Sequence, residues 1–209
     1  MIDTILFDLD GTLIDSNQLI IDSFKQVFEK EYPDLKVSET EYVSFIGPTL
    51  WQSFSKYESD LDKVEDLVRL YKHYNKINHD KSIKPFPNAL VLLKTLKVKG
   101  YKIGIASSKM HEVVKQGLFI SGLLDYVDVI VGMDDVVNHK PDPEALNKAM
   151  SLLEGKKAVY IGDHPNDIKA GKNANMLTIG VGYSWHLDLL KESNPNFIIN
   201  DLLEVLNYV

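Results

Sequence analysis

The sequence predicts an α/β protein: a doubly wound parallel sheet with a Rossmann-like core and a helical insert after its first strand. From about residue 85 onward, short apolar runs that favour strands alternate with amphipathic helical segments. This is the pattern of right-handed crossovers between parallel strands. The first strand-like run, residues 1–7, is instead followed by a long stretch with helical periodicity and no strand pattern. We therefore expect a sheet whose first strand is separated from the others by a helical domain.

Length and composition exclude several classes of protein. The chain has 209 residues, 44% of them hydrophobic and 25% charged, which suits one large domain or a core with an insert. Its net charge of −7 offers no basic surface for nucleic acid or an anionic membrane. The absence of cysteine excludes disulfides, thiolate catalysis and cysteine-bound metal. No stretch has the form of a secretion signal or a membrane span. We expect a cytoplasmic monomer or homodimer that binds neither nucleic acid nor membrane.

The first part of the chain contains the first strand and the insert. Residues 1–7 are apolar and strand-favouring, as in a buried parallel strand. A helix is expected to start at Asp15 or Ser16 and to end before Pro33. Helical patterning continues to about residue 80, with a glycine-proline break within residues 45–50. The expected domains are a core of residues 1–15 and 84–209 and a helical insert of residues 16–83.

Alternating elements follow in the second part of the chain. Helices are expected over residues 88–99, 111–120, 142–153 and 166–174 and from Leu202, and strands over residues 102–106, 127–131, 157–161, 177–181 and 197–199. Gly100 and Asn175 directly follow two of these helices, and both residue types tolerate the left-handed backbone that ends a helix. Each strand–helix–strand unit predicts two parallel strands in one sheet.

Two acidic residues stand at the end of the first strand. The motif Asp8-Leu9-Asp10-Gly11-Thr12 follows directly after Phe7, and open α/β sheets bind ligands outside the carboxyl ends of their strands. Gly11 allows a sharp turn that leaves its amide exposed to an anion. An ordinary acidic turn has a similar composition, so this motif alone leaves both interpretations open.

Polar residues also follow three later strands, and each has an ordinary alternative. Ser107-Ser108-Lys109 could hold a phosphate oxygen or cap the next helix. Lys140, which is followed by Pro141 and Pro143, could be catalytic or solvated. Asp163 and Asp167 could bind Mg²⁺, which prefers a few carboxylates and several waters. Alternatively, Asp163 could cap a helix and Asp167 could stabilise its first turn.

In this order, the four motifs closely resemble those of the haloacid dehalogenase superfamily, over essentially the whole chain. The helical insert resembles that superfamily's type 1 helical cap. The resemblance implies a Mg²⁺-dependent phosphotransferase core in which Asp8 is the nucleophile and forms an aspartyl-phosphate. It also implies that Asp10 protonates the leaving group and later activates water as a general base.

The resemblance assigns roles to the other motif residues as well. Ser107 would bind a phosphoryl oxygen, and Lys140 would stabilise the charge on the nucleophile and the phosphoryl group. The substrate would also be bound by Gly11, Thr12, Ser108 and Lys109. The metal would be held by Asp8, the Asp10 carbonyl and Asp163, with Asp167 in support.

Within the superfamily, the chain is similar to the phosphoglycolate phosphatase and bacterial pyrophosphatase group, most of all through residues 45–56 of the cap. This implies a small phosphorylated substrate, either inorganic pyrophosphate or a phosphomonoester such as phosphoglycolate. A phosphomutase acting on a sugar phosphate shares these motifs and remains an alternative. A phospho-aspartate signalling receiver, from a different class, lacks such a long insert. His164 is expected at the rim of the site or within reach of the substrate.

Overall fold

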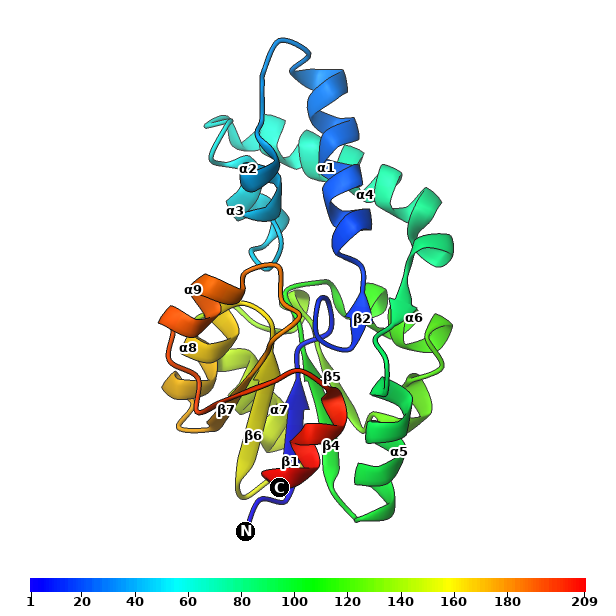
Figure 1. Ribbon diagram of the computed structural model, residues 1–209. Helices are drawn as coiled ribbons and strands as arrows, with labels where there is room; N and C mark the ends of the chain where they lie inside the picture. The colour runs from blue at the N-terminus through cyan, green and yellow to red at the C-terminus, as the bar shows by residue number, and fades with distance from the viewer. The chain divides into compact units, whose positions relative to one another are not determined.

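The structure, a computed structural model, describes residues 1–209. Six parallel strands form its main sheet, in the order β5-β4-β1-β6-β7-β8 (Figure 1). Their bounds are β1 (Thr4–Phe7), β4 (Lys102–Ala106), β5 (Val129–Val131), β6 (Ala158–Gly162), β7 (Leu177–Val181) and β8 (Phe197–Ile199). All neighbouring strands pair in parallel. The predicted doubly wound parallel sheet is confirmed.

Helices connect the strands and cover both faces of this sheet (Figure 1). They are α5 (Ala89–Val98), α6 (His111–Ile120), α7 (Glu144–Leu153), α8 (Pro165–Asn173) and α9 (Leu187–Glu192), with short 3₁₀ turns η1 (Leu124–Tyr126), η2 (Met133–Asp135) and η3 (Leu202–Asn207). The connections through α5 and α6 step toward β5, whereas those through α7 and α8 step toward β8. Right-handed crossovers therefore place these two pairs of helices on opposite faces.

The central strands are buried on both faces. Leu6 of β1 and Tyr160 of β6 pack with Leu146 and Leu153 of α7 and with Ala170 of α8. Because side chains alternate along a strand, their neighbours in sequence face α5 and α6. The direction of the crossovers reverses between β1 and β6, and such a reversal opens a crevice at the carboxyl ends of the strands. The sequence motifs lie at this edge.

The chain forms two compact units, one of Met1–Asp15 with Lys84–Val209 and the other of Ser16–Ile83. The second unit consists of α1 (Asn17–Glu31), α2 (Glu39–Val43), α3 (Leu50–Phe54) and α4 (Leu61–Ser82). Its interior is aromatic: the Phe24 ring centroid lies 4.7 Å from those of Phe45 and Tyr71. Ser38 and Thr49 cap α2 and α3 through their side chains. The predicted helical patterning and the break within residues 45–50 are confirmed.

Several short elements differ from the sequence-based expectation. The segment expected to be free of strands contains β2 (Ile14–Asp15), which pairs antiparallel with β3 (Lys84–Pro85). These pieces have two residues each and are too short to show a period of two. The helix predicted from Leu202 is a 3₁₀ turn, and α9 lies where the sequence pattern predicts no helix. None of the helices combines the length and the apolar character that a membrane span requires.

Candidate active site

The strand register brings the two acidic motifs together at the edge of the sheet. Phe7 of β1 pairs with Ile161 of β6, and the Asp8 amide donates to the Ile161 carbonyl at 2.8 Å. Asp8 therefore leaves the sheet beside Gly162, directly before Asp163. Asp167 lies in the first turn of α8. Two neighbouring parallel strands and one helix thus carry the three carboxylates to a single point.

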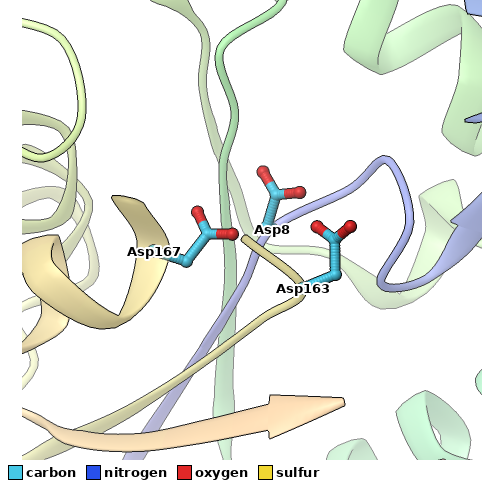
Figure 2. A group of neighbouring side chains, drawn as sticks. All are labelled: Asp8, Asp163 and Asp167. Carbon is cyan, nitrogen blue, oxygen red and sulfur yellow. The ribbon is translucent and has the colours of Figure 1, made fainter. Parts of the chain in front are cut away.

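Asp8, Asp163 and Asp167 are all buried and converge on one another (Figure 2). One oxygen from each carboxylate lies within 4.8 Å of the others. Oδ2 of Asp163 is buried without a hydrogen-bond partner, which is unfavourable unless a cation or water completes the site. Carboxylate oxygens are the ligands that hard divalent cations prefer. The donor set therefore fits Mg²⁺.

Two glycines make room for these carboxylates. Gly11 has a φ of +75°, and a Cβ there would collide with the Asp163 carboxylate. A Cβ on Gly162 would collide with the Asp167 side chain. A larger residue at either position would push apart the acids that the strand register brings together.

Lys140 is the cation of this cluster. Its Nζ lies 2.7 Å from Asp8 Oδ1 and 2.6 Å from Asp167 Oδ1. Its side chain is only 6% exposed, so the alternative of a solvated lysine is wrong. One ammonium faces three carboxylates, which leaves excess negative charge when all three are ionised.

Burial and charge shift the pKa values of this cluster in different directions. Burial raises the pKa of Asp8 to about 7, against the lowering effect of Lys140. Burial also raises the pKa of Asp163 well above its usual range, and the charges of Asp8 and Asp167 add to this. Burial acts in the same direction on Asp167, but Lys140 and His164 together outweigh it, so the pKa of that carboxyl is lowered. Despite its own burial, Lys140 has a raised pKa because Asp167 and Asp8 stabilise its charge.

Asp10 and Lys109 form a second ion pair at the site. Lys109 Nζ lies 2.6 Å from Asp10 Oδ1, and both side chains are partly exposed. The Asp10 carboxylate is not part of the three-carboxylate cluster. Asp10, the second acid of the first motif, thus pairs with Lys109 after β4, although the two residues are 99 positions apart in the chain.

The remaining predicted substrate-binding residues lie in the loops after β1 and β4. The Ser107 hydroxyl accepts from the Lys109 amide at 3.2 Å, and Ser108 is partly exposed beside it. The helix that follows, α6, has no side-chain cap, so the alternative of a serine cap is wrong. Thr12 is fully buried, and its hydroxyl has no hydrogen-bond partner.

His164, rather than Asp163, caps α8. Its Nδ1 accepts from the Asn166 amide at 3.1 Å, and its own amide donates to Asp167 Oδ2 at 2.9 Å. The His164 ring also packs against His186, with the centroids 4.7 Å apart. Burial lowers the pKa of His164 to about 4. Because the cap is supplied by the neighbouring residue, the Asp163 carboxylate is left for another role.

Three residues around the site escaped the sequence analysis. The Tyr160 hydroxyl lies 3.0 Å from Lys140 Nζ. The Tyr183 hydroxyl donates to the Thr12 carbonyl at 2.7 Å, and Ser184 Oγ donates to the Asp163 carbonyl at 2.5 Å. Two of these contacts hold the backbone of the acidic loops in place. Only their position within or just after a strand marks these residues, and many core residues share it.

Known proteins resemble this chain over its full length. The profile of the family described as haloacid dehalogenase-like hydrolase matches residues 5–181. A protein named pyrophosphatase PpaX from Halalkalibacterium halodurans is 40% identical over 211 residues, which cover 100% of this chain and 97% of the relative. A solved structure of a predicted phosphatase from Clostridium acetobutylicum has 32% identity and a TM-score of 0.84, covering 100% of this chain and 98% of its own. The solved structure of a haloacid dehalogenase-like family hydrolase from Streptococcus pneumoniae has 25% identity and a TM-score of 0.86, and the match covers 99% of this chain and 98% of that structure's chain.

Proposed function

Since this chain belongs to the haloacid dehalogenase-like hydrolase family, we propose that it is a Mg²⁺-dependent phosphohydrolase with inorganic pyrophosphate as its preferred substrate. The observation that supports this best is the convergence of the Asp8, Asp163 and Asp167 carboxylates, two of which, Asp8 and Asp167, pair with the Lys140 ammonium. A phosphoryl group and a carboxylate nucleophile repel each other, so positive charge must surround both before they react. At this site, Lys140 supplies one positive charge, and the three carboxylates could bind a divalent cation that supplies more.

Asp8, Asp163 and Asp167 would hold the metal ion, together with the Asp10 carbonyl. Bound Mg²⁺ would neutralise negative charge on the phosphoryl group and orient it toward the nucleophile. Lys140 contributes a second positive charge, 2.7 Å from an Asp8 oxygen, and lowers the pKa of that carboxyl against the effect of burial. It thereby favours the ionised form of Asp8 that attack requires.

In the first step, an Asp8 carboxylate oxygen attacks phosphorus in line, and the bond to the leaving-group oxygen breaks. Asp10 donates its proton to that oxygen. Lys109, which lies on Asp10 in the free protein, can move to the negatively charged leaving group. The main-chain amides after Asp8 and the Ser107 hydroxyl bind the oxygens of the transferred phosphoryl group.

In the second step, water attacks the phosphorus of the aspartyl-phosphate. Asp10, now a carboxylate, takes a proton from that water, and the bond between phosphorus and the Asp8 oxygen breaks. Phosphate leaves, and Asp8 regains its carboxylate. Both steps use the same two acids, two residues apart at the end of β1.

Three observations favour pyrophosphate over phosphoglycolate. The relative from Halalkalibacterium halodurans that is 40% identical carries the name pyrophosphatase. Arg69, the only arginine, belongs to the helical unit and is paired with Asp66, so the unit that carries the acidic cluster has no arginine to clamp a substrate carboxylate. Pyrophosphate is compact and highly charged, which suits recognition by a divalent cation and lysine point charges.

A phosphate-release assay tests the proposal. Purified protein is incubated with pyrophosphate, phosphoglycolate, a sugar phosphate or a nucleotide, with Mg²⁺ or with a chelator. We expect the highest specificity constant for pyrophosphate and no turnover with the chelator. Product analysis of the sugar phosphate reaction separates hydrolysis from a mutase, which returns an isomer.

Two results would overturn parts of the proposal. A specificity constant for phosphoglycolate or a sugar phosphate that exceeds that for pyrophosphate tenfold refutes the substrate assignment. Failure to release phosphate from every substrate in the presence of Mg²⁺ refutes the phosphohydrolase assignment itself.

A further inference from the structure

We propose that Tyr160 is a positioning residue that holds the Lys140 ammonium between Asp8 and Asp167. This role rests on the proposed phosphohydrolase function, in which Lys140 stabilises charge on the nucleophile. Tyr160 lies on β6, on the face of the sheet that packs against α7 and α8, and is fully buried. Its hydroxyl therefore reaches Lys140 from within the core, on the side of the sheet covered by α7 and α8.

Counting hydrogen-bond donors shows why the hydroxyl is needed. The Lys140 ammonium has three N–H donors, but four oxygens lie within reach. Their distances from Nζ are 2.6 Å for Asp167 Oδ1, 2.7 Å for Asp8 Oδ1, 3.0 Å for the Tyr160 hydroxyl and 3.2 Å for the Ala106 carbonyl. One of these acceptors must be served by another donor.

Tyr160 resolves this competition with its single O–H. The hydroxyl lies 3.0 Å from the Ala106 carbonyl, whereas the ammonium lies 3.2 Å from it. The hydroxyl also lies 3.1 Å from Asp167 Oδ1, but that oxygen already accepts from Lys140 at 2.6 Å. If Tyr160 donates to that carbonyl, its oxygen can accept the third Lys140 N–H. The other two lysine donors then go to Asp8 and Asp167, and every group is satisfied. Tyr160 thus keeps the ammonium off the backbone carbonyl and on the two acids.

Tyr160→Phe would remove the hydroxyl with its contacts to Lys140, the Ala106 carbonyl and Asp167. The ring would keep its packing against α7 and α8, since the hydroxyl is the only group lost. The third Lys140 N–H would then have the Ala106 carbonyl as its remaining partner, which draws the ammonium away from Asp8. We expect Tyr160→Phe to lower kcat for pyrophosphate about tenfold, or ~1.4 kcal/mol of activation free energy. KM should change less than twofold, because substrate binding does not use this hydroxyl.

A matched variant separates positioning from a general loss of stability. Tyr71 in the helical unit is also buried, and its hydroxyl accepts from Asn75 at 3.4 Å. Tyr71→Phe likewise removes a buried hydroxyl, and it should leave kcat within twofold of wild type. Equal losses of kcat in both variants would mean that Tyr160 acts only through stability.

A double variant tests whether Tyr160 acts through the lysine. Lys140→Arg keeps the positive charge but replaces the ammonium with a planar group of different geometry. If Tyr160 acts by positioning that ammonium, adding Tyr160→Phe to Lys140→Arg should lower kcat less than twofold further. A full tenfold additional loss would show independent effects and overturn the proposal.

A crystal structure of Tyr160→Phe provides a readout that does not depend on activity. We expect the distance from Lys140 Nζ to the Ala106 carbonyl to shorten and that to Asp8 to lengthen. If the wild type releases phosphate, two results overturn the role of Tyr160 without affecting the proposed function. One is an ammonium that has not moved in Tyr160→Phe, and the other is an unchanged kcat in that variant. If the wild type releases no phosphate, the proposed function fails, and the ammonium position still decides whether Tyr160 positions Lys140.

Discussion

Asp163 carries a buried carboxylate oxygen without a hydrogen-bond partner, so its replacement by asparagine should stabilise the metal-free protein. The variant Asp163→Asn keeps the shape of the side chain and removes its negative charge. The new amide can also donate to the neighbouring carboxylates. A substitution in the candidate active site is thus expected to raise stability while it removes activity.

The size of the effect follows from the environment of the carboxylate. An unsatisfied buried polar group costs about 1–3 kcal/mol, and for a protein of this length 1 kcal/mol shifts the Tm by about 2–4 °C. We therefore expect Asp163→Asn to raise the Tm by roughly 2–12 °C in the presence of a chelator. Because the pKa of Asp163 is raised by burial and nearby charge, its acid form is favoured in the folded protein. The wild type loses stability as pH rises through that pKa, so the advantage of the variant grows with pH.

Thermal unfolding with and without Mg²⁺ measures both parts of this prediction. Wild type should gain about 2.7 kcal/mol at a Mg²⁺ concentration of 100 times Kd, whereas Asp163→Asn should respond weakly. Asp167→Asn is the matched control, since it makes the same change four residues away. There Lys140 loses a partner at 2.6 Å and the pKa of the acid is lowered. We expect that variant to be destabilised by about 3 kcal/mol.

Opposite signs for the two asparagine variants are the decisive result. If Asp163→Asn lowers the Tm in chelator as much as Asp167→Asn does, the Asp163 carboxylate is stabilising in the free protein. If it also keeps the full wild-type response to Mg²⁺, Asp163 does not hold the metal. Either outcome refutes the reasoning from its unpartnered oxygen.

Three further variants test the roles of single side chains. Asp8→Asn should abolish turnover and the trapping of labelled phosphate on the protein, because the nucleophile is gone; turnover above a tenth of the wild-type rate contradicts this. Asp10→Asn should spare cleavage of pyrophosphate more than that of an alkyl phosphate, because phosphate leaves more readily than an alkoxide; rapid-quench kinetics with equal losses on both substrates would contradict it. His164→Gln should flatten the acid side of the stability curve. Burial lowers the pKa of His164 from 6.5 to about 4, so the unfolded state binds more protons between these values and wild type loses up to about 3 kcal/mol as pH falls. Urea unfolding at pH 7 and 4.5 measures this loss, and parallel curves for both proteins would refute it.

Much of the fold and the grouping of the acids could be predicted because both depend on simple periodic patterns. β4, β7 and β8 have the predicted bounds, since each is a short apolar run between turn residues. The convergence of Asp8 and Asp163 follows from one rule: neighbouring parallel strands end at the same edge. The left-handed backbone of Asn175, with a φ of 56°, also agrees with its expected place after a helix.

Other features depend on contacts between side chains that no local pattern reveals. In the sequence, Tyr160 cannot be distinguished from any other large residue of a buried strand. The tertiary structure places its hydroxyl 3.0 Å from Lys140 Nζ. Aspartate is a common helix cap, so the sequence offers Asp163 as one possible cap of α8. Instead, histidine supplies the acceptor one residue later. Side-chain hydrogen-bond partners depend on tertiary packing, whereas the ends of strands can be predicted from the local pattern of apolar and polar residues.

The arrangement of these groups explains why the nucleophile should depend on a second cation. Three carboxylates and one lysine leave a charge of −2 when all are ionised, and burial holds the pKa of Asp8 at about 7. Burial thus favours the protonated form of Asp8, which cannot attack phosphorus, more than it would be favoured in an exposed aspartate. A divalent cation would bring the charge of the cluster to zero and favour the ionised form. The same ion would give the unpartnered oxygen of Asp163 a ligand. Binding of a divalent cation by these carboxylates would therefore also favour the ionised, nucleophilic form of Asp8.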